Sequence, residues 1–403
     1  MTATPSVPAC PVCGGNHARL FFSLSDQPVL IGVLWPDADS ARACRRGDID
    51  LAFCPDCGFI WNVSFDPDRI EYDQQYDNSL HFSPTFQNYS QKLVDRLVDT
   101  YGLHQRTVVD IGCGKGDFLA MLCEAGGNTG YGFDPSYEGE RVNTSAADRI
   151  TWSNDYYGEE HARLQADLLA SRFVYEHIPA PNDFLRMIRR SITDPDRTVI
   201  YFEVPDTDLI IRQGSVWDVI YEHCSYFSVE SLTRSFAVCG FDVLRVEETF
   251  EKQFLTIEAR AARTDTGNPG SNTGNPGSNT GNLGQLAADV AAFGETQNAK
   301  MSDWRDRLAQ WRAEGRRAVA WGAGAKAVGF LNMLGDRDTI TRVVDINPHK
   351  QGKHLAGTGQ QIISPQALTE DPPDVVVLMN PIYRNEITAQ LAELGLAPEL
   401  INS

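Results

Sequence analysis

Residues 106–126 read RTVVDIGCGKGDFLAMLCEAG, and this stretch decides the fold class of the 403-residue chain. Residues 108–111 read VVDI, a mostly apolar stretch typical of a buried strand, and three glycines follow it, Gly112, Gly114 and Gly116. The residues after the glycines have the spacing of an amphipathic helix. A strand that turns through glycines into a helix predicts an α/β fold with a largely parallel sheet.

Two carboxylates accompany this turn. Asp110 ends the first strand, and Asp134 ends the next strand, in YGFDPS. A carboxylate at the second position is suited to accept hydrogen bonds from both ribose hydroxyls of an adenosine-containing ligand. The turn reads D-x-G-x-G-x-G, and Asp110 suits a cationic ligand better than a pyrophosphate, which needs uncovered amide donors. The pattern resembles the first motif of the class I methyltransferases, whose methyl donor S-adenosylmethionine carries a sulfonium and an ammonium.

The strands that follow fit the same resemblance. Asp155 follows the strand that begins near residue 150 and is a candidate partner for the adenine amino group. The segment EHIPAP (176–181) resembles the fourth-strand region of the class, and we interpret His177 there as a loop or packing residue rather than a base. With the three glycines and the two aspartates, the residues expected to bind the cofactor are Tyr72, Pro135 and Asp155.

Two C-x-x-C pairs lie near the start of the chain. CPVCGG (10–15) and CPDCGF (54–59) each place two thiols before a glycine that permits a tight turn. Cys44 lies between the pairs as an alternative ligand, and two unrelated reduced pairs are the other reading. We expect a closed tetrahedral zinc site of structural kind, with the ligands Cys10, Cys13, Cys54 and Cys57.

The composition narrows the classes of partner. The formal net charge of −19 argues against a surface that neutralises nucleic-acid phosphates, and so against a zinc-dependent RNA-modifying protein. No apolar run approaches the roughly 20 residues that span a bilayer, and no signal peptide is recognisable. We therefore expect a cytoplasmic protein with a small-molecule substrate, no nucleic acid and no membrane partner, and we leave its oligomeric state open.

The second half of the chain begins with a repeat. Residues 266–284 read TGNPGSNTGNPGSNTGNLG, a composition that cannot bury enough apolar area to fold, so we expect a flexible linker. A helical segment follows at 285–313, and Trp304, Leu308 and Trp311 fall on one of its faces. We predict four parts: a zinc-binding domain (1–70), an S-adenosylmethionine-binding core (71–263), the linker (264–284) and a helical connector with a C-terminal Rossmann-like domain (285–403).

A second glycine turn, WGAGAKAVGFLNMLG (321–335), opens the C-terminal α/β pattern. Asp345 lies where a dinucleotide-binding carboxylate would lie, so an oxidoreductase that uses a nicotinamide is one alternative. Lys326 stands inside the turn and could equally reach a phosphate group of a substrate.

The order of motifs resembles a known family. After the two C-x-x-C pairs come Y-D-x-x-Y (72–76), the methyltransferase-like core, Y-E-H-x-x-Y-F (221–227) and the G-A-x-A-K turn. This order is similar to that of the zinc-containing sugar C-methyltransferases of deoxysugar biosynthesis. The resemblance implies methylation of a carbon next to a ketone in a nucleotide-linked sugar, with His223 as the base and Tyr221, Glu222 and Tyr76 around it.

This chemistry suits those residue types. The unperturbed pKa of imidazole, about 6.5, lies near working pH, and tyrosine hydroxyls can donate hydrogen bonds to a developing enolate oxygen. Another substrate with an acidic C–H bond, or O- or N-methylation in the same fold, is the alternative. The residues expected to bind the substrate are Asn78, Ser79, His81, Glu203 and Lys326.

Overall fold

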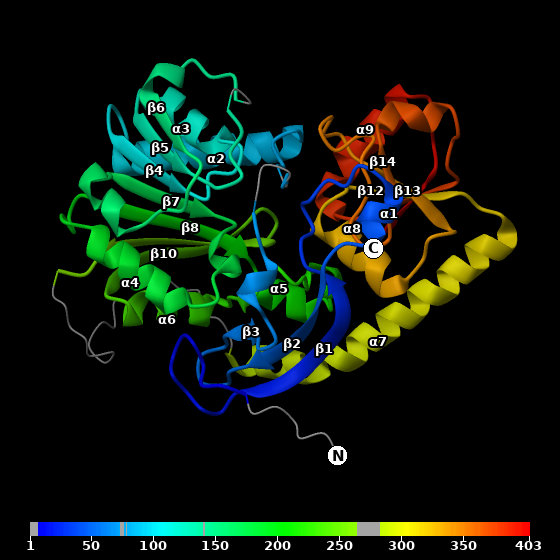
Figure 1. Cartoon of the computed structure of the whole chain (residues 1–403), viewed down its shortest axis with the longest axis horizontal. Coiled ribbons are helices and arrows are strands. Elements are labelled where there is room, and N and C mark those ends of the chain that lie inside the picture. Colours follow the sequence, from blue (N-terminus) through cyan, green and yellow to red (C-terminus); the bar gives the residue numbers. More distant parts are fainter. Residues whose placement is uncertain (1–6, 73–75, 78, 140–141, 264–282) are drawn as a thin grey trace.

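The strands of the described residues form three sheets. The computed structural model describes residues 7–72, 76, 77, 79–139, 142–263 and 283–403. The candidate residue Asn78 and residues 264–282 of the expected linker lie outside this set. Figure 1 shows the central sheet and the C-terminal sheet as two lobes, with the N-terminal sheet below and between them.

The central sheet has its topological switch point between β4 and β7. The order across it is β10 (Phe241–Thr249), β11 (Phe254–Ala261), β8 (Val199–Pro205), β7 (Leu168–Arg172), β4 (Thr107–Ile111), β5 (Thr129–Phe133) and β6 (Ile150–Ser153). Neighbouring strands are parallel except at β11, which is antiparallel to β8 and to β10. The predicted Rossmann-like α/β core is confirmed, and a ligand crevice is expected at the carboxyl ends of the strands that flank the switch point.

Helices cover both faces of the central sheet. Successive side chains of a strand point to opposite faces, so Val108 packs toward α2 (Pro84–Tyr101) and α3 (Asp117–Gly126). Val109 packs on the other face with residues of α4 (Pro181–Ser191) and α6 (Val229–Val238).

The glycine turn after β4 has two positions that need glycine. Gly112 has φ of +68°, and a Cβ there would lie 2.2 Å from a methyl carbon of Val174. Gly116 has φ of +97°, and a Cβ there would lie 2.5 Å from the ring of Trp152. The first and third glycines thus permit close packing and a left-handed backbone at the start of α3.

The N-terminal sheet contains a strand from the middle of the chain. Its antiparallel order is β1 (Arg19–Pro28), β2 (Arg46–Phe53), β3 (Ile60–Asn62) and β9 (Ser225–Tyr226). Ile60 pairs with Tyr226 and Trp61 with Ser225. The segment that carries His223 is therefore attached to the N-terminal sheet and not to the central one.

The C-terminal lobe is a smaller parallel sheet. Its order is β14 (Gln361–Ile363), β13 (Ile340–Val344), β12 (Ala318–Trp321), β15 (Val375–Leu378) and β16 (Glu399–Asn402). The second glycine turn leads from β12 into α8 (Ala325–Leu334), and α9 (Arg384–Glu393) follows β15. A Rossmann-like arrangement in this part of the chain agrees with the expected fold class.

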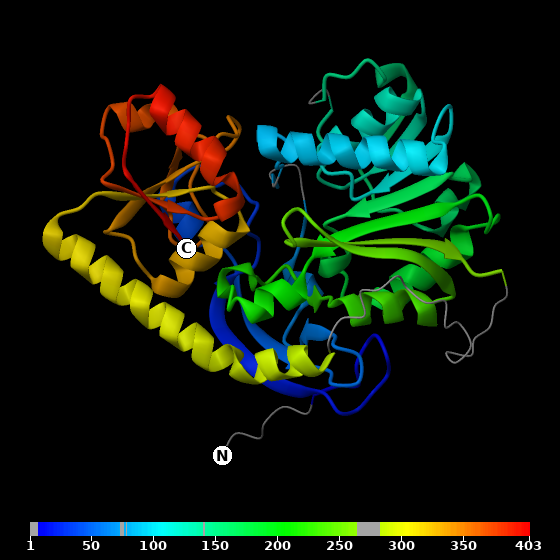
Figure 2. The ribbon, with the colours of Figure 1, turned by 180° about the vertical axis from the view of Figure 1, so that it is seen from behind.

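A long helix joins the lower sheet to the C-terminal lobe. Helix α7 (Leu283–Glu314) contacts β1 and α5 (Thr207–Arg212) near its start and α8 near its end. Figures 1 and 2 show it crossing beneath both lobes. The predicted helix is confirmed, and Trp304, Leu308 and Trp311 are buried on its inner face.

The remaining helices are short. They are α1 (Ala38–Arg42) and the 3₁₀ turns η1 (Pro67–Arg69), η2 (Ala147–Arg149), η3 (Glu159–Leu164), η4 (Tyr175–His177), η5 (Val216–Asp218), η6 (Pro365–Thr369) and η7 (Pro381–Tyr383). Helix α8 packs closely against η5, which immediately precedes the His223 segment.

We expect Gly329→Ala to destabilise the fold. A Cβ at Gly329 in α8 would lie 2.7 Å from the backbone oxygen of Trp217 in η5, and backbone cannot move aside cheaply. Overpacking of this kind should lower the free energy of unfolding by about 1–3 kcal/mol. Gly294→Ala in α7 is the matched control, because a Cβ there meets nothing within 4 Å. Denaturant unfolding that ranks Gly329→Ala at or above Gly294→Ala in stability would contradict the packing argument.

Candidate functional site

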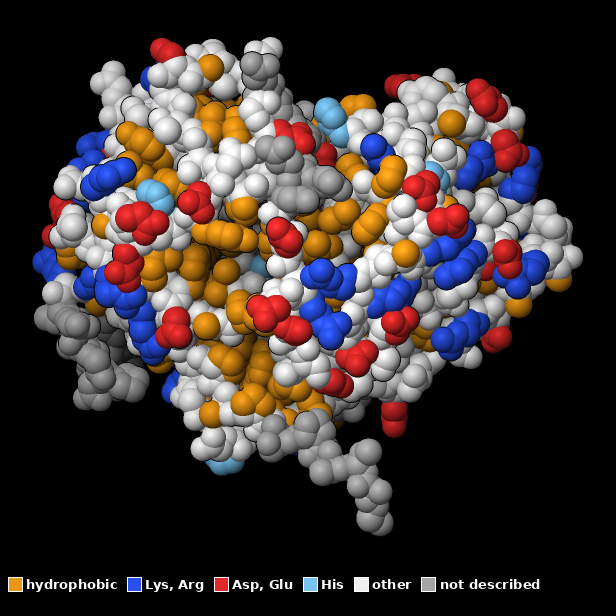
Figure 3. All heavy atoms as spheres, in the orientation of Figure 1, with side chains coloured by type: hydrophobic (Ala, Val, Ile, Leu, Met, Phe, Trp, Pro, Cys, Tyr) orange, Lys and Arg blue, Asp and Glu red, His pale blue; other side chains and the backbone are white. Residues whose placement is uncertain are grey.

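A cavity of about 900 Å³ lies where the three sheets meet. Residues at the carboxyl ends of β4, β5 and β7 line one side, and the second glycine turn lines the other. Ser83 at the start of α2 donates a 2.7 Å hydrogen bond to Glu386 of α9, which joins the two lobes beside the cavity. On the face of the molecule drawn in Figure 3, hydrophobic side chains gather in the middle, below the notch between the two lobes.

The first glycine turn forms one end of the cavity. Asp110, Gly112, Gly114, Asp134 and Pro135 all line it. Asp134 accepts hydrogen bonds from the backbone N–H groups of Gly114 (2.8 Å) and Ser136 (2.7 Å), which fix its carboxylate beside the turn. Burial raises the pKa of Asp110 to about 7.

Two expected cofactor residues do not line this end of the cavity. The side chain of Asp155 is exposed, and Gly116 packs against Trp152 instead. Tyr156, next to Asp155, lines the cavity and is 64% exposed.

Glu222 is the centre of a buried polar group. The carboxylate is fully buried and accepts a hydrogen bond from the backbone N–H of Ile31. Its other oxygen accepts from the hydroxyls of Tyr76 (2.9 Å) and Tyr72 (3.4 Å). Burial raises the pKa of Glu222 to about 7. Tyr72 was expected to bind the cofactor and Tyr76 to be catalytic, and the two hydroxyls meet at one carboxylate.

Two histidines lie side by side at the cavity wall. The rings of His177 and His223 are 4.9 Å apart and nearly perpendicular, and both line the cavity. His177 Nδ1 lies 3.1 Å from the backbone oxygen of Glu222, and since that oxygen only accepts, this nitrogen carries the hydrogen. His223 Nδ1 is buried and has no hydrogen-bond partner among the described residues.

Burial keeps both rings uncharged. It lowers the pKa of His177 to about 4, and it lowers the pKa of His223 well below 6.5, with the neighbouring His177 lowering it further. An uncharged imidazole with a lone pair facing a cavity can accept a proton from a bound molecule.

The structure places Tyr221 away from His223, contrary to the expected catalytic group. The Tyr221 hydroxyl accepts a 2.9 Å hydrogen bond from the backbone N–H of Asp66, and its ring packs against Phe65 and Gly47. The side chain does not line the cavity. Tyr221 and Glu222 lie in a turn before β9, where Tyr221 anchors the segment to Asp66 and Glu222 faces the polar group.

Glu203 also does not lie in the ligand crevice, where it was predicted to be. It is fully buried and forms an ion pair with Arg172 at the end of β7, and it does not line the cavity. Arg172 does line the cavity, with its guanidinium 4.3 Å from the centre of the Phe118 ring. The sequence analysis missed Arg172, although it directly ends an apolar strand.

The sequence analysis also missed Glu176. It is 2% exposed and lines the cavity, and its Oε2 has no hydrogen-bond partner in the described part of the chain. Glu176, His177 and His223 each offer an atom within 4.8 Å of the others. The sequence feature that could have indicated Glu176 is its position beside His177, shortly after a parallel strand.

The other expected substrate residues approach the cavity from two sides. Ser79 and His81 line it ahead of α2, and burial lowers the pKa of His81 to about 3. Lys326 lines it from the C-terminal lobe and forms a 2.7 Å ion pair with Asp218 of η5. Lys300 of α7 also lines the cavity, with its ammonium over the ring of Trp217.

Known proteins similar to this chain are methyltransferases. A methyltransferase domain family matches residues 82–246, and the family described as the C-methyltransferase C-terminal domain matches residues 284–397. The C-methyltransferase NovU of Streptomyces niveus is 26% identical over 392 residues, which cover 94% of this chain and 90% of that protein. The protein is an S-adenosylmethionine-dependent C-methyltransferase.

Methyltransferases are also found among the solved structures that are similar to the enzyme. A methyltransferase from Aquifex aeolicus is 16% identical, with a TM-score of 0.33, over 45% of this chain and 95% of that one. The magnesium protoporphyrin IX methyltransferase of Synechocystis, solved with S-adenosylhomocysteine, is 19% identical, with a TM-score of 0.34, over 44% of this chain and 84% of that one. In the described part of the enzyme, no helix is long and apolar enough to cross a membrane.

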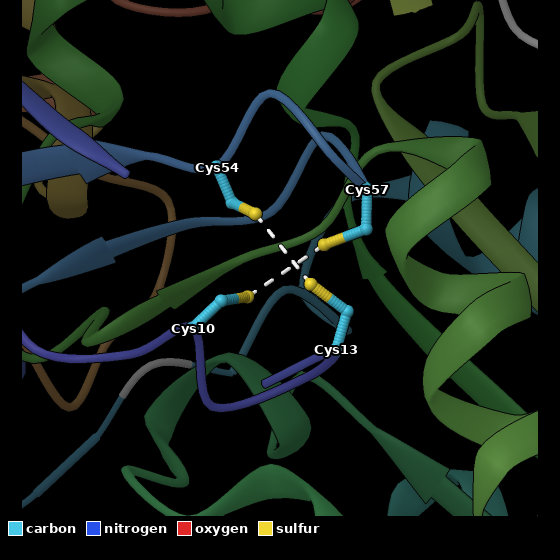
Figure 4. A group of neighbouring side chains, drawn as sticks. All are labelled: Cys10, Cys13, Cys54 and Cys57. Carbon is cyan, nitrogen blue, oxygen red and sulfur yellow. Dashed lines mark hydrogen bonds between the residues drawn. The ribbon is translucent and has the colours of Figure 1, made fainter. Parts of the chain in front are cut away.

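The four N-terminal cysteines of the methyltransferase meet at one point. Figure 4 shows their sulfur atoms pointing to a common centre from two loops, and two Sγ–Sγ distances, Cys10–Cys57 and Cys13–Cys54, are both 3.6 Å. Zinc–sulfur bonds of about 2.3 Å in a tetrahedron place the sulfurs about 3.8 Å apart, so the four residues fit a zinc ion. Cys44 is buried elsewhere and is not part of this group.

We expect Cys54→Ser to remove bound zinc and to lower the Tm of the enzyme. Loss of one thiolate from a closed four-sulfur site removes metal affinity that stabilises the fold. Cys44→Ala, which leaves the four sulfurs intact, is the matched control. Metal analysis should find about one zinc per chain in the wild type and in Cys44→Ala. Retention of zinc by Cys54→Ser would contradict the assignment.

Proposed function

We propose that this enzyme removes a proton from a carbon next to a ketone and directs that carbon to the methyl group, on a nucleotide-linked keto-deoxysugar. The observation that supports it most is His223, an uncharged imidazole at the wall of a cavity that also contains the first glycine turn. Carbon methylation needs a base, because a C–H bond is not itself a nucleophile.

His223 is the base in this proposal. A lone pair on its ring accepts the proton from the carbon, the C–H electron pair moves into a new C=C bond, and the carbonyl oxygen becomes an enolate oxygen. His177 lies beside it and carries its hydrogen on the nitrogen that faces the Glu222 backbone oxygen. As interpreted from the sequence, we assign His177 to packing and not to the role of the base.

Glu222, Tyr72 and Tyr76 hold the wall of the site. The two hydroxyls donate to the Glu222 carboxylate, so they fix this residue next to His223 rather than reach freely into the cavity. This arrangement preorganises the base, because no side chain has to reorient when the substrate enters.

The first glycine turn is the proposed cofactor site. Asp134 has acceptor capacity left beside its two backbone hydrogen bonds, and it is suited to the ribose hydroxyls. Asp110 lines the cavity, and a cationic donor bound beside it would stabilise its ionised form. When bound, S-adenosylmethionine supplies an electrophilic methyl group.

The nucleotide portion of the substrate is assigned to the C-terminal lobe. Lys326 and Lys300 are cations at the cavity wall and suit phosphate oxygens. The Asp345 carboxylate accepts hydrogen bonds from the backbone N–H groups of Ala323 and Asn347, both at 2.8 Å, and thereby holds the second glycine turn. In this proposal the lobe binds substrate and does not use a nicotinamide.

Deuterium exchange tests the proposal. The enzyme is incubated in D₂O with a nucleotide-linked keto-deoxysugar and S-adenosylhomocysteine, so that no methyl group is available. We expect the proton next to the ketone to exchange with the wild type, and His223→Ala to lose about 10²–10⁴-fold of the rate. His104→Ala is the control, because His104 is exposed and does not line the cavity.

Absence of exchange in the wild type, with S-adenosylhomocysteine still bound in calorimetry, would overturn C–H deprotonation of this substrate. Another substrate with an acidic C–H bond would then take its place. Exchange by His223→Ala at the wild-type rate would instead reject His223 as the base.

The pH dependence of exchange follows from the lowered pKa of His223. A base works in its unprotonated form, so a pKa well below 6.5 extends activity to acidic pH. We expect the exchange rate to be nearly constant between about pH 7 and pH 6 and to fall only below that range. A tenfold decline across pH 7 to 6 would contradict the burial of this imidazole in its uncharged form.

A further inference from the structure

A base alone does not complete the site, because the enolate oxygen needs a hydrogen-bond donor. This inference rests on the proposed function and concerns that oxygen. Donors placed where charge develops supply a large share of catalysis in such reactions. Tyr221 and Tyr76 were the expected donors, and Tyr221 is turned toward Asp66. The contacts of Tyr76 and of the neighbouring Tyr72 therefore decide whether a tyrosine hydroxyl near His223 is free.

Both tyrosine hydroxyls already have an acceptor. Tyr76 donates to Glu222 at 2.9 Å. Tyr72 lies 3.0 Å from His177 Nδ1, which carries a hydrogen of its own, so the Tyr72 hydroxyl accepts there and donates toward Glu222 at 3.4 Å. A donor for the substrate oxygen therefore has to come from another side chain at this wall.

Glu176 meets the geometric requirement. Its carboxyl group lines the cavity, and its Oε2 is buried with no hydrogen-bond partner in the described ranges of the chain. Its oxygen and a ring nitrogen of His223 lie within 4.8 Å of each other. In a ketone the oxygen is about 2.4 Å from the neighbouring carbon. The Glu176 oxygen and the His223 nitrogen are therefore close enough to contact the oxygen and the neighbouring carbon of one ketone substrate.

We propose that Glu176 acts as a neutral carboxylic acid and donates a hydrogen bond to the enolate oxygen that His223 generates. The C–H bond breaks, its proton goes to His223, and the electron pair passes through the new C=C bond to the oxygen. Glu176 keeps its proton throughout and contacts the reacting oxygen directly, so it is a catalytic residue.

The surroundings favour the neutral form of this acid. Burial, with a smaller contribution from the charge of Glu203, raises the pKa of Glu176 to about 8. From its own turn it faces His177, and from the neighbouring segment it faces His223 and Cys224, whose Sγ lies 3.6 Å from the Glu176 backbone oxygen. Burial keeps the Cys224 thiol protonated by raising its pKa to about 12, and it keeps both imidazoles uncharged.

The nearest guanidinium does not offset this effect. Arg172 of β7 forms a buried ion pair with Glu203 of β8, the strand that packs against the turn of Glu176. With that cation paired, an ionised Glu176 would be a buried anion with no ion-pair partner among the described residues, which is costly.

Two substitutions of similar size separate donation from mere packing. Glu176→Gln keeps an N–H donor at the same position, whereas Glu176→Leu removes the donor. In the deuterium exchange assay we expect Glu176→Leu to lose about 10²–10³-fold of the wild-type rate and Glu176→Gln to stay within about tenfold of it. The wild-type rate should also decline above about pH 8 as the acid ionises, and Glu176→Gln should lack this decline, because an amide does not ionise.

Each other outcome rejects this assignment. Exchange by Glu176→Leu at the wild-type rate would show that the carboxyl group is not used. Equal loss in both variants, with S-adenosylhomocysteine binding and Tm retained, would show that a carboxylate is needed instead of a donor. A persisting alkaline decline in Glu176→Gln would assign it to another group. A wild type without exchange overturns the proposed function itself, whereas loss in His223→Ala with full activity in Glu176→Leu rejects only this inference.

Discussion

The pairing of β3 with β9 is the contact on which the rest of the site depends. Two residue pairs join Ile60 and Trp61 to Tyr226 and Ser225, and the backbone N–H of Asn62 donates to the oxygen of Cys224 at 3.0 Å. His223 lies two residues before β9. Strand β9, which is far from the N-terminus in sequence, is thereby held as the edge strand of the N-terminal sheet. This pairing fixes the position of the segment that carries His223 at the cavity wall.

The N-terminal region is consequently part of the wall of the proposed site and not only a support beside it. Cys54 and Cys57 belong to the loop that leads into β3, so a metal held there would fix the strand that holds β9. Residue Ile31 supplies a backbone N–H to Glu222, and Val33 forms a β-bridge with Tyr76. A metal site without an open coordination position can in this way influence catalysis through backbone geometry alone.

In both lobes a carboxylate holds a glycine turn in the same way, although we assign different ligands to the two turns. In each, a carboxylate at the end of the second strand accepts a backbone N–H from the glycine turn after the first strand: Asp134 from Gly114, and Asp345 from Ala323, both at 2.8 Å. The turns face one cavity from opposite sides. Cofactor and substrate portions can therefore be held by the same kind of turn, while the residues between them supply the chemistry.

The sequence by itself determined the fold class, because the strand, glycine turn and helix at 106–126 have local requirements that few other folds meet. It also determined the cysteine pairs and the long helix before Ala318, since spacing alone reveals both. Only the tertiary structure decided which side chains face the cavity, both in the 220–228 segment and at Glu203 and Glu176. Tyr221 is turned toward Asp66 and Glu203 is paired with Arg172, whereas Glu176 lines the cavity and its Oε2 has no hydrogen-bond partner in the described part of the chain. The physical reason is that the direction of a side chain depends on which strand its segment pairs with, and β9 pairs with a strand more than 160 residues earlier in the chain.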